Sequence, residues 1–350
     1  MRSVTKNDSM ITCISSASSL PADASVYGLD VSSSMEIRYF VAVGLGITLV
    51  IGIIGNLLMV LVLAKSLQSS NNPVSTMTCT FMVNVTVSDL LFLLYNVPVM
   101  LLSFIFEDWV MGPFVCVSSQ SMSMLTMFCS FYSMVATSVL RYVAVVHPTH
   151  DLSYSRSQRF GLVTLMWILG FLVSLPSWLH QGVAEVGYST YCIFCMTEFQ
   201  TFLYFVLFGG VAFLPAVVVM AICYWEIIRF LWGWHISGAH ADLGRHRKNR
   251  KVTATILTIV TAFIVMWMPY WAVTFLMANH SLSPKPLVYV VSSLATLMAY
   301  SNCCISPLIY FAFSEQFRLE LSKLFRRRQR GKLPKQIYQI HIALRAMVSR

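Results

Sequence analysis

The sequence predicts an all-α membrane protein, a bundle of seven transmembrane helices followed by a short amphipathic eighth helix. Three observations predict this fold. The 350 residues are 57% hydrophobic and only 11% charged, whereas soluble globular proteins are roughly 25% charged. Seven segments long enough to cross a bilayer carry almost no charge. The basic residues between these segments fall mainly on one side of the membrane.

The lengths of the uncharged segments set the number of helices. A helix rises about 1.5 Å per residue, so about 20 residues cross the roughly 30 Å hydrocarbon layer. Breaking the sequence at its charged residues leaves seven such segments: 39–64, 74–106, 109–140, 160–181, 199–225, 252–277 and 286–313. We therefore expect an extracellular tail at 1–38, a seven-transmembrane domain at 39–313, and an amphipathic helix with a basic cytoplasmic tail at 314–350.

Lysine and arginine set the orientation of the bundle. An odd number of crossings places the two ends of the chain on opposite sides. In one orientation 20 of the 24 basic residues lie on the side of the C-terminal tail, and the basic side of a membrane protein is cytoplasmic. We expect a multi-pass plasma-membrane protein with an extracellular N-terminus, glycosylated at Asn7 and Asn279. The net charge of +10 is a membrane asymmetry, so no nucleic-acid partner is expected.

The first two spans carry polar residues inside apolar runs. In the first, Gly55 permits close helix contact and Asn56 can hydrogen-bond within the bundle. In the second, Asp89 is the only charged side chain inside any of the seven segments. A carboxylate in hydrocarbon is costly, so Asp89 must face the bundle and find water, an ion or a proton. A protonated, purely structural aspartate is the alternative.

The third span organises the rest of the chain. It has a cysteine, Cys116, at its outer end and Arg141 at its inner end, with 32 uncharged residues between Asp108 and Arg141. We interpret it as a central helix with an outer disulfide anchor and an inner cationic switch, rather than any span with a flanking arginine. Oxidation is permitted outside the cell. Cys116 is expected to pair with Cys192 or with Cys195, the former being favoured; the remaining cysteine would then pair with Cys13.

Prolines interrupt the later spans and predict hinges. The fifth span contains Pro215, the sixth contains Trp267 and Pro269, and the seventh contains Pro307 followed by Tyr310. A proline within a helix removes a backbone hydrogen bond and bends it. Aromatic residues in helices usually serve packing, so Trp267 alone would indicate little.

The segment after the seventh span has helical apolar spacing. Positions 313, 317, 321, 324 and 325 are apolar, and basic residues occupy the other face. This pattern predicts an amphipathic helix on the inner leaflet, with membrane lipid as the partner of the basic tail. A solvated basic tail is the alternative.

Taken together and in order, these residues resemble the rhodopsin-like (class A) G-protein-coupled receptors. The markers are Gly55-Asn56, Asp89, Trp109, Cys116, Arg141-Tyr142, Trp167, Pro215, Trp267-x-Pro269 and Pro307-x-x-Tyr310. Within the family, His147-Pro148 and the run 299–318 are most similar to peptide receptors, nearest the galanin, allatostatin and kisspeptin branch.

The resemblance implies neuropeptide signalling rather than enzymatic activity. An extracellular ligand, expected to be a peptide, would displace Trp267, swing the sixth helix at Pro269, and open a cleft for a heterotrimeric G protein. Arg141, Tyr142 and Tyr310 would form the G-protein switch. The family's sodium pocket maps onto four polar residues, Asp89, Ser130, Asn302 and Ser306. Apart from this sodium ion the resemblance implies no metal or cofactor.

Three departures from the family pattern lie at the switch. Leu140 stands where the family has an acid before the arginine, and Ser306 stands where it has an asparagine. Cys223 takes the place of the usual fifth-helix tyrosine, which follows as Tyr224. We expect altered, raised basal signalling. The alternative is a receptor-fold protein with atypical, constitutive or no G-protein coupling, acting as a decoy or partner subunit.

The ligand chemistry is read from the outer ends of the helices. Amine receptors of this family carry an aspartate in the outer half of the third helix, which reads Ser-Gln120-Ser-Met-Ser here, so an amine is not expected. An acidic outer rim would favour a basic peptide, unless its members are ordinary solvated acids; the rim comprises Glu107, Asp108, Glu185 and Glu198. Candidate pocket residues are Gln120, His180, Tyr270 and Trp271, with core packing as the alternative for the aromatic ones.

Other seven-helix or membrane functions fit less well. A retinal pump needs a lysine inside the seventh span, and the sequence has none between Lys285 and Arg318. A transporter is expected to show internal repeats, which this sequence lacks. An intramembrane hydrolase needs a second catalytic group beside Asp89.

Overall fold

The computed structural model describes residues 31–69, 72–106, 108–147, 154–186, 189–236, 243–278, 286–313 and 317–322. Several predicted features lie outside these residues: the sequons at Asn7 and Asn279, the acidic-rim residue Glu107, the expected partner cysteine Cys13, and the basic tail.

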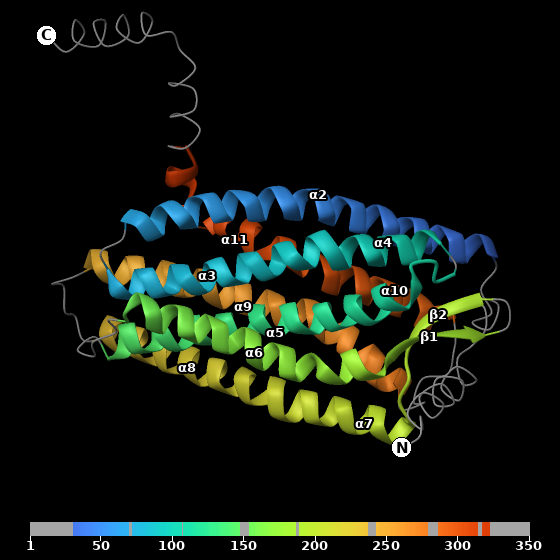
Figure 1. The fold of residues 1–350 in the computed structure, drawn as a ribbon. Helices are drawn as coiled ribbons and strands as arrows, with labels where there is room; N and C mark the ends of the chain where they lie inside the picture. Colours follow the sequence, from blue (N-terminus) through green and yellow to red (C-terminus); the bar gives the residue numbers. More distant parts are fainter. Residues whose placement is uncertain are drawn as a thin grey trace, which may run out of the picture.

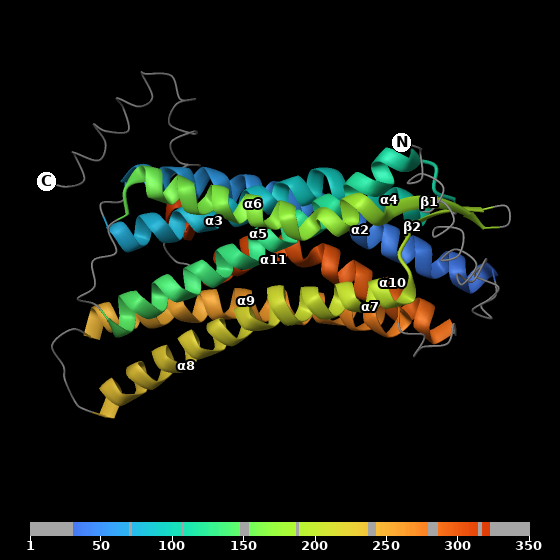
Figure 2. The same ribbon diagram turned by 60° about the horizontal axis from the view of Figure 1, so that its bottom comes forward.

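Seven helical spans form one bundle, with a two-stranded hairpin at one end (Figures 1 and 2). The first five spans and the hairpin are α2 (Val31–Ser69); α3 (Pro73–Leu91), η2 (Phe92–Asn96) and α4 (Val97–Ile105); α5 (Gly112–Val146); α6 (Arg156–His180); β1 (Gln181–Val186) and β2 (Ser189–Phe194); and α7 (Glu198–Leu207), η3 (Phe208–Phe213) and α8 (Leu214–Ile236). The last two are α9 (Leu243–Ala278); and α10 (Pro286–Ser301), η5 (Asn302–Cys304) and α11 (Ile305–Phe313). The predicted fold class is confirmed.

The first helix begins at Val31, before the predicted domain start at residue 39. The expectation rested on Arg38 as a break in the apolar run. Instead the helix continues through Arg38, whose guanidinium donates hydrogen bonds to the carbonyls of Phe104 and Ile105 at 3.1 and 3.0 Å. These are free carbonyls at the C-terminal end of α4, which a cationic side chain stabilises.

The third span, α5, runs through the middle of the bundle and is the most buried of the seven (Figure 1). It packs against α3, α6 and α8. In its inner half Phe131 stacks on Phe213 and Phe263, with ring centroids 4.7 and 5.3 Å apart. This places the predicted organising helix at the centre of the core.

Glycines bring the first helix against its neighbours. A Cβ added at Gly55 would lie 2.9 Å from Cβ of Pro307, and one at Gly52 would lie 2.6 Å from a methyl of Leu93. Beside them the fully buried Asn56 donates from Nδ2 to the carbonyls of Gly52 and Cys303, both at 2.9 Å. The predicted small-residue contact and buried amide therefore join α2 to the seventh span.

Irregular turns accompany two of the three predicted proline hinges. The π-helical η3 immediately precedes the turn that contains Pro215, and the 3-10 turn η5 precedes Pro307. Tyr132 of α5 donates to the carbonyl of Ala212 within η3 at 2.6 Å. By contrast α9 continues through Pro269 as one helix.

The eighth helix is described at residues 317–322. Two of its predicted apolar positions, Phe317 and Leu321, are buried against Met59 and other residues of α2 and α3. Glu320 pairs with Lys65 of α2, with 2.6 Å between Nζ and Oε2. This part of the apolar face thus contacts protein, whereas the expectation placed it on lipid.

Candidate functional site

The hairpin end of the bundle, which the sequence predicts to be the outer one, contains a cavity of about 270 Å³, called the outer cavity below. It lies between the second, third and seventh spans, with the hairpin as its roof. Its lining residues are Asn96, Val99, Met100, Ser103, Asp108, Trp109, Ser119, Gln120, Gln181, Thr190, Tyr191, Cys192 and Tyr300.

Covalent and hydrogen bonds hold the hairpin over this cavity. Strands β1 and β2 are antiparallel, and a disulfide joins Cys192 of β2 to Cys116 at the start of α5. The first outer loop is bonded to the same strand, because Trp109 N donates to the carbonyl of Thr190 at 2.8 Å. The structure therefore has the favoured cysteine pair. Cys195 is also disulfide-bonded, to a partner outside the described residues.

The predicted pocket residues are divided by the structure. Gln120 lines the outer cavity, whereas His180, Tyr270 and Trp271 do not. Tyr270 and Trp271 belong to an aromatic cluster deeper in the sixth span, where Trp271 packs on Phe208 with centroids 5.1 Å apart. His180 ends α6, and its carbonyl accepts from Cys195 N at 2.7 Å. Both residues have packing contacts, and Tyr270 also hydrogen-bonds the side chain of Gln120, which lines the cavity. Their part in ligand binding stays a prediction.

The sequence analysis missed Asn96, Gln181 and Tyr300. Asn96 follows Asp89 by two helical turns in an otherwise apolar run, a signal that could have identified it. Gln181 could not be found in this way, because the hairpin that places it over the cavity was not predicted. Tyr300 lies within the run 299–318, to which the sequence analysis assigned no ligand contact.

One member of the acidic rim reaches the cavity. Asp108 lines it, and Asp108 Oδ1 accepts from Thr190 N at 3.3 Å. Glu185 is exposed on β1, outside the lining. Glu107 and the side chain of Glu198 lie outside the part of the chain that the structure describes.

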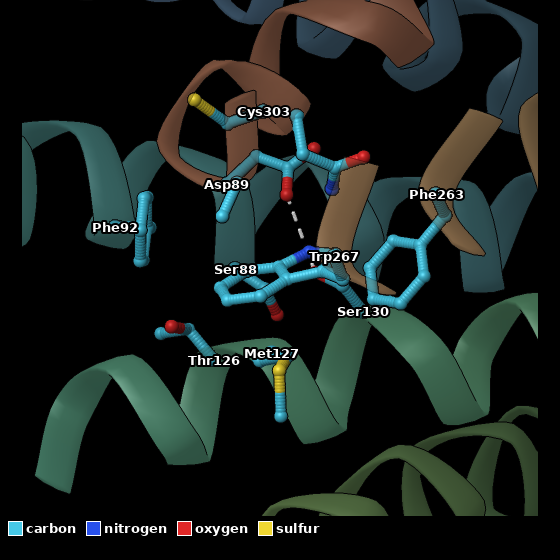
Figure 3. Close-up of a pocket in the computed structure, with 11 residues that line it drawn as sticks. Ser88, Asp89, Phe92, Thr126, Met127, Ser130, Phe263, Trp267 and Cys303 are labelled. Atoms are coloured by element: carbon cyan, nitrogen blue, oxygen red, sulfur yellow. Dashed lines mark hydrogen bonds between the residues drawn. The ribbon is translucent and has the colours of Figure 1, made fainter. Parts of the chain in front are cut away.

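The middle of the bundle holds a second, smaller cavity around Asp89 (Figure 3). Asp89 is 6% exposed, and one of its carboxylate oxygens accepts from Ser130 Oγ at 3.3 Å. Asn302 lines the same space, and Ser306 joins these three residues in an adjoining cavity. The structure thus brings together all four residues of the predicted sodium pocket.

The chemistry of this cavity fits a small, hard cation. Its lining includes the oxygen atoms of Asp89, Ser88, Ser130 and Asn302, the type of ligand that such cations prefer. Within the described part of the chain, Ser88 Oγ lines the cavity and has no hydrogen-bond partner. The space is about the size of one water molecule. No lysine, arginine or histidine is among the residues that line it.

Trp267 forms one wall of the Asp89 cavity (Figure 3). Its indole is buried and contacts Phe92 edge-on, with centroids 6.4 Å apart, and Phe263 at 6.2 Å. Phe263 is also part of the stack with Phe131. A displacement of Trp267 would therefore change both the Asp89 cavity and the core stack.

At the inner end, Arg141 has no carboxylate partner among the described residues. Their ion pairs are Lys65–Glu320 and Arg229–Glu226, and the Nε of Arg141 is buried and unbonded. Tyr310, Tyr224 and Cys79 are its nearest electrostatic neighbours. Leu140 is 6% exposed and packs in an apolar cluster with Met77 and Phe81 of α3.

The other predicted switch residues take different positions. Tyr224 is buried, and its hydroxyl lies 3.0 Å from Ser138 Oγ on α5, so the one-residue offset still leaves a tyrosine in the core near Arg141. Tyr310 donates to Met82 Sδ at 3.1 Å. Tyr142 instead pairs with His147 at 3.2 Å, at the end of α5.

Comparison with known proteins agrees with this architecture. A family profile described as "7 transmembrane receptor (rhodopsin family)" matches residues 55–310. Galanin receptor 2a of Danio rerio is 27% identical over 303 residues, covering 84% of this chain and 80% of the relative. Galanin receptor type 3 of Homo sapiens is 28% identical, with 89% and 86% covered, and galanin receptor type 1 of Homo sapiens is 27% identical, with 87% and 86% covered.

Proposed function

The chain belongs to the rhodopsin family of seven-transmembrane receptors, and from that premise we propose that it binds an extracellular peptide and activates heterotrimeric G proteins. The observation that carries the proposal is the pairing of two sites across one bundle. A cavity with polar side chains in its lining lies at the hairpin end, beside the start of α5, and Arg141 lies near the opposite end of that helix. A receptor belongs to no class of enzyme, in agreement with the expectation.

The hairpin end is proposed to be extracellular, with the N-terminus on the same side. Disulfides form and persist in oxidising compartments, and the Cys116–Cys192 bond lies at the hairpin end. The excess of basic residues in the segments at the other end supports the same orientation.

The proposed ligand is a peptide of the type that galanin receptors, by their name, recognise. The outer cavity of about 270 Å³ is smaller than the roughly 300–1,000 Å³ of sites that enclose a drug-sized ligand. A peptide can place one end in such a cavity while the rest lies over the outer loops. Asp108 at the rim would attract a ligand with basic residues.

Signal transfer is proposed to run through the aromatic residues between the two sites. Trp267 contacts Phe263, and Phe263 stacks on Phe131 of α5. A ligand that binds one arrangement of these side chains more tightly shifts the bundle toward it. Movement of α9 would then expose Arg141 to the G protein, because no described carboxylate holds its guanidinium in place.

A sodium ion is proposed as an allosteric ligand of the Asp89 cavity. Asp89 would supply the charge, and Ser130, Asn302, Ser306 and Ser88 would supply neutral oxygens. The bound ion would favour the compact, inactive arrangement. The test compares agonist affinity in sodium with agonist affinity in potassium at equal ionic strength. Asp89→Asn should abolish any difference between the two. A sodium effect that persists in this variant would contradict the assignment.

Raised basal coupling is the second candidate, and one observation favours it. Leu140 fills an apolar cluster where the family pattern places an acid beside the arginine. Arg141 is therefore released from an ion pair that would otherwise oppose activation. A decoy receptor would share this feature but would not activate a G protein.

The test is a G-protein activation assay on intact cells that express the full chain. A panel of neuropeptides that includes galanin would be applied to wild type and to Arg141→Ala at matched surface expression. We expect a peptide-dependent response, above a raised basal level, that Arg141→Ala removes. Peptide binding with no activation would favour the decoy, and no peptide binding at all would contradict the proposal. An N-terminal epitope that antibodies reach on intact cells would support the orientation.

A further inference from the structure

An unpaired amide lies at the outer cavity. Asn96 ends the π-helical segment η2 and is only 2% exposed, yet its side chain lines the cavity. Both of its polar atoms, Oδ1 and Nδ2, are buried, and none of the described residues hydrogen-bonds to either. More than about 90% of buried polar groups in proteins have a hydrogen-bond partner. A side chain that lacks two partners at a cavity wall is suited to a ligand.

A second amide lines the same cavity from the hairpin. Gln181 begins β1, and its Nε2 donates to Cys192 Sγ at 3.2 Å. Its Oε1 is buried and has no partner within the described part of the chain. The second span, through Asn96, and the hairpin, through Gln181, therefore each present an amide atom without a described partner. The cavity between them has polar groups on two sides.

The charges of the lining restrict what can bind. Asp108 is the only charged side chain among the residues that line the cavity, and no lysine or arginine is included. A ligand carboxylate would be desolvated there without a counter-ion and near a negative charge, which is unfavourable. The group that reaches Asn96 must be neutral and must offer a donor and an acceptor together.

Resting on the proposed function, we infer that this cavity binds a primary carboxamide of the peptide ligand through Asn96. The ligand N–H donates to Asn96 Oδ1, and Asn96 Nδ2 donates to the ligand carbonyl, which forms a closed pair of hydrogen bonds. A primary carboxamide carries its donor and acceptor side by side. The N–H and C=O of one trans peptide group point in opposite directions and cannot form this pair.

Two parts of a peptide carry a primary carboxamide: an amidated C-terminus and the side chain of asparagine or glutamine. Four capped amino acids separate them. N-acetyl-leucinamide has a terminal carboxamide, N-acetyl-glutamine methyl ester has only a side-chain carboxamide, N-acetyl-leucine has a carboxylate, and N-acetyl-leucine methyl ester is neutral without an amide N–H₂. Each has the size of the single residue that a cavity of about 270 Å³ admits.

The measurement is the thermal unfolding midpoint of the purified full-length protein with each probe. At about 20 mM, we expect one or both carboxamides to raise the midpoint by about 1 °C or more, and the acid and the leucine methyl ester to have no effect. The carboxamide that acts identifies the source. Stabilisation by neither carboxamide, or equal stabilisation by all four probes, would overturn the inference.

Two variants make the test specific. Asn96→Leu keeps the shape of the side chain without its polar atoms and should remove the discrimination, with Asn96→Ala as the substitute if it does not fold. Ser103→Ala is the matched control, because Ser103 lines the same cavity with its hydroxyl already bonded to the carbonyl of Val99. Carboxamide stabilisation that persists in Asn96→Leu, or that disappears in Ser103→Ala, would count against the assignment.

The stability of the ligand-free variant provides an independent check. Exchanging an unpaired buried amide for an apolar group of the same shape is neutral or stabilising. Ligand-free Asn96→Leu should therefore unfold at or above the wild-type midpoint, and a fall of more than about 3 °C would show that the amide is already paired. None of these measurements involves a G protein, so a failure of signalling and a failure of carboxamide binding are distinguishable.

Discussion

Removing one hydroxyl should destabilise the fifth span. Tyr132 donates to the carbonyl of Ala212 at 2.6 Å, inside η3, where the α-helical hydrogen-bond pattern is interrupted. The Tyr132→Phe variant leaves that carbonyl without this donor. Its ring can still stack on Phe128, whose ring centroid lies 4.2 Å from that of Tyr132 in the wild type. The change therefore isolates the hydrogen bond from the packing.

The expected loss follows from the cost of an unpaired group. A buried acceptor without its partner costs about 1–3 kcal/mol in soluble proteins, while hydrogen bonds in membranes average about 0.6 kcal/mol. For this single bond we take about 1–2 kcal/mol. At about 2–4 °C per kcal/mol, the unfolding midpoint should fall by about 2–8 °C.

The assay can use the protein's own thiols. Five cysteines in the described residues are free and buried, so a thiol-reactive dye reports unfolding of the purified full-length protein. Tyr39→Phe is the matched control, because Tyr39 is 65% exposed. If Tyr132→Phe unfolds within about 1 °C of this control, the bond to Ala212 contributes little and the reasoning is wrong.

Three further predictions follow from the switch, the disulfide and the helix contacts. Leu140→Asp should lower basal G-protein activation by restoring a partner for the neighbouring arginine, with Leu140→Met as the packing control; unchanged or higher activity would contradict this. Cys116→Ser and Cys192→Ser should each reduce surface expression, and the double variant should be no worse than either, since both remove one bond; additive losses would argue against the pairing. Gly55→Val should lower the free energy of unfolding by about 1–3 kcal/mol, because its side chain would overlap Pro307. Gly46→Val is the control and should not, because nothing lies within 4 Å of a Cβ added there. Equal thermal midpoints of the two variants would refute the contact.

The spans and the central helix could be predicted because membrane insertion constrains sequence strongly. Asp89 and Arg141 stand out in apolar surroundings, and the burial of Asp89 within the bundle follows from the cost of charge in hydrocarbon. The first helix extends beyond the predicted span, because an arginine such as Arg38 can remain helical while its side chain reaches free carbonyls.

The outer cavity could not be predicted because it depends on tertiary placement. Gln181 reaches it only through the hairpin, whose six-residue strands carry no strong alternating pattern. Tyr224 is another case: it stands one residue beyond the family position, and its hydroxyl still lies beside Ser138 of α5. Sequence position along a helix is therefore a weaker guide than the direction in which the side chain points.

The clamp between Lys65 and Glu320 has a mechanical consequence. Together with the glycine-mediated contact of α2 with the seventh span, it joins α2, the seventh span and residues 317–322 at one corner of the bundle. We expect large movements of the helix ends at this end of the bundle on the opposite side, where α8 and α9 lie (Figure 2). The corner at Lys65 then serves as the fixed reference against which a movement of α9 can be measured.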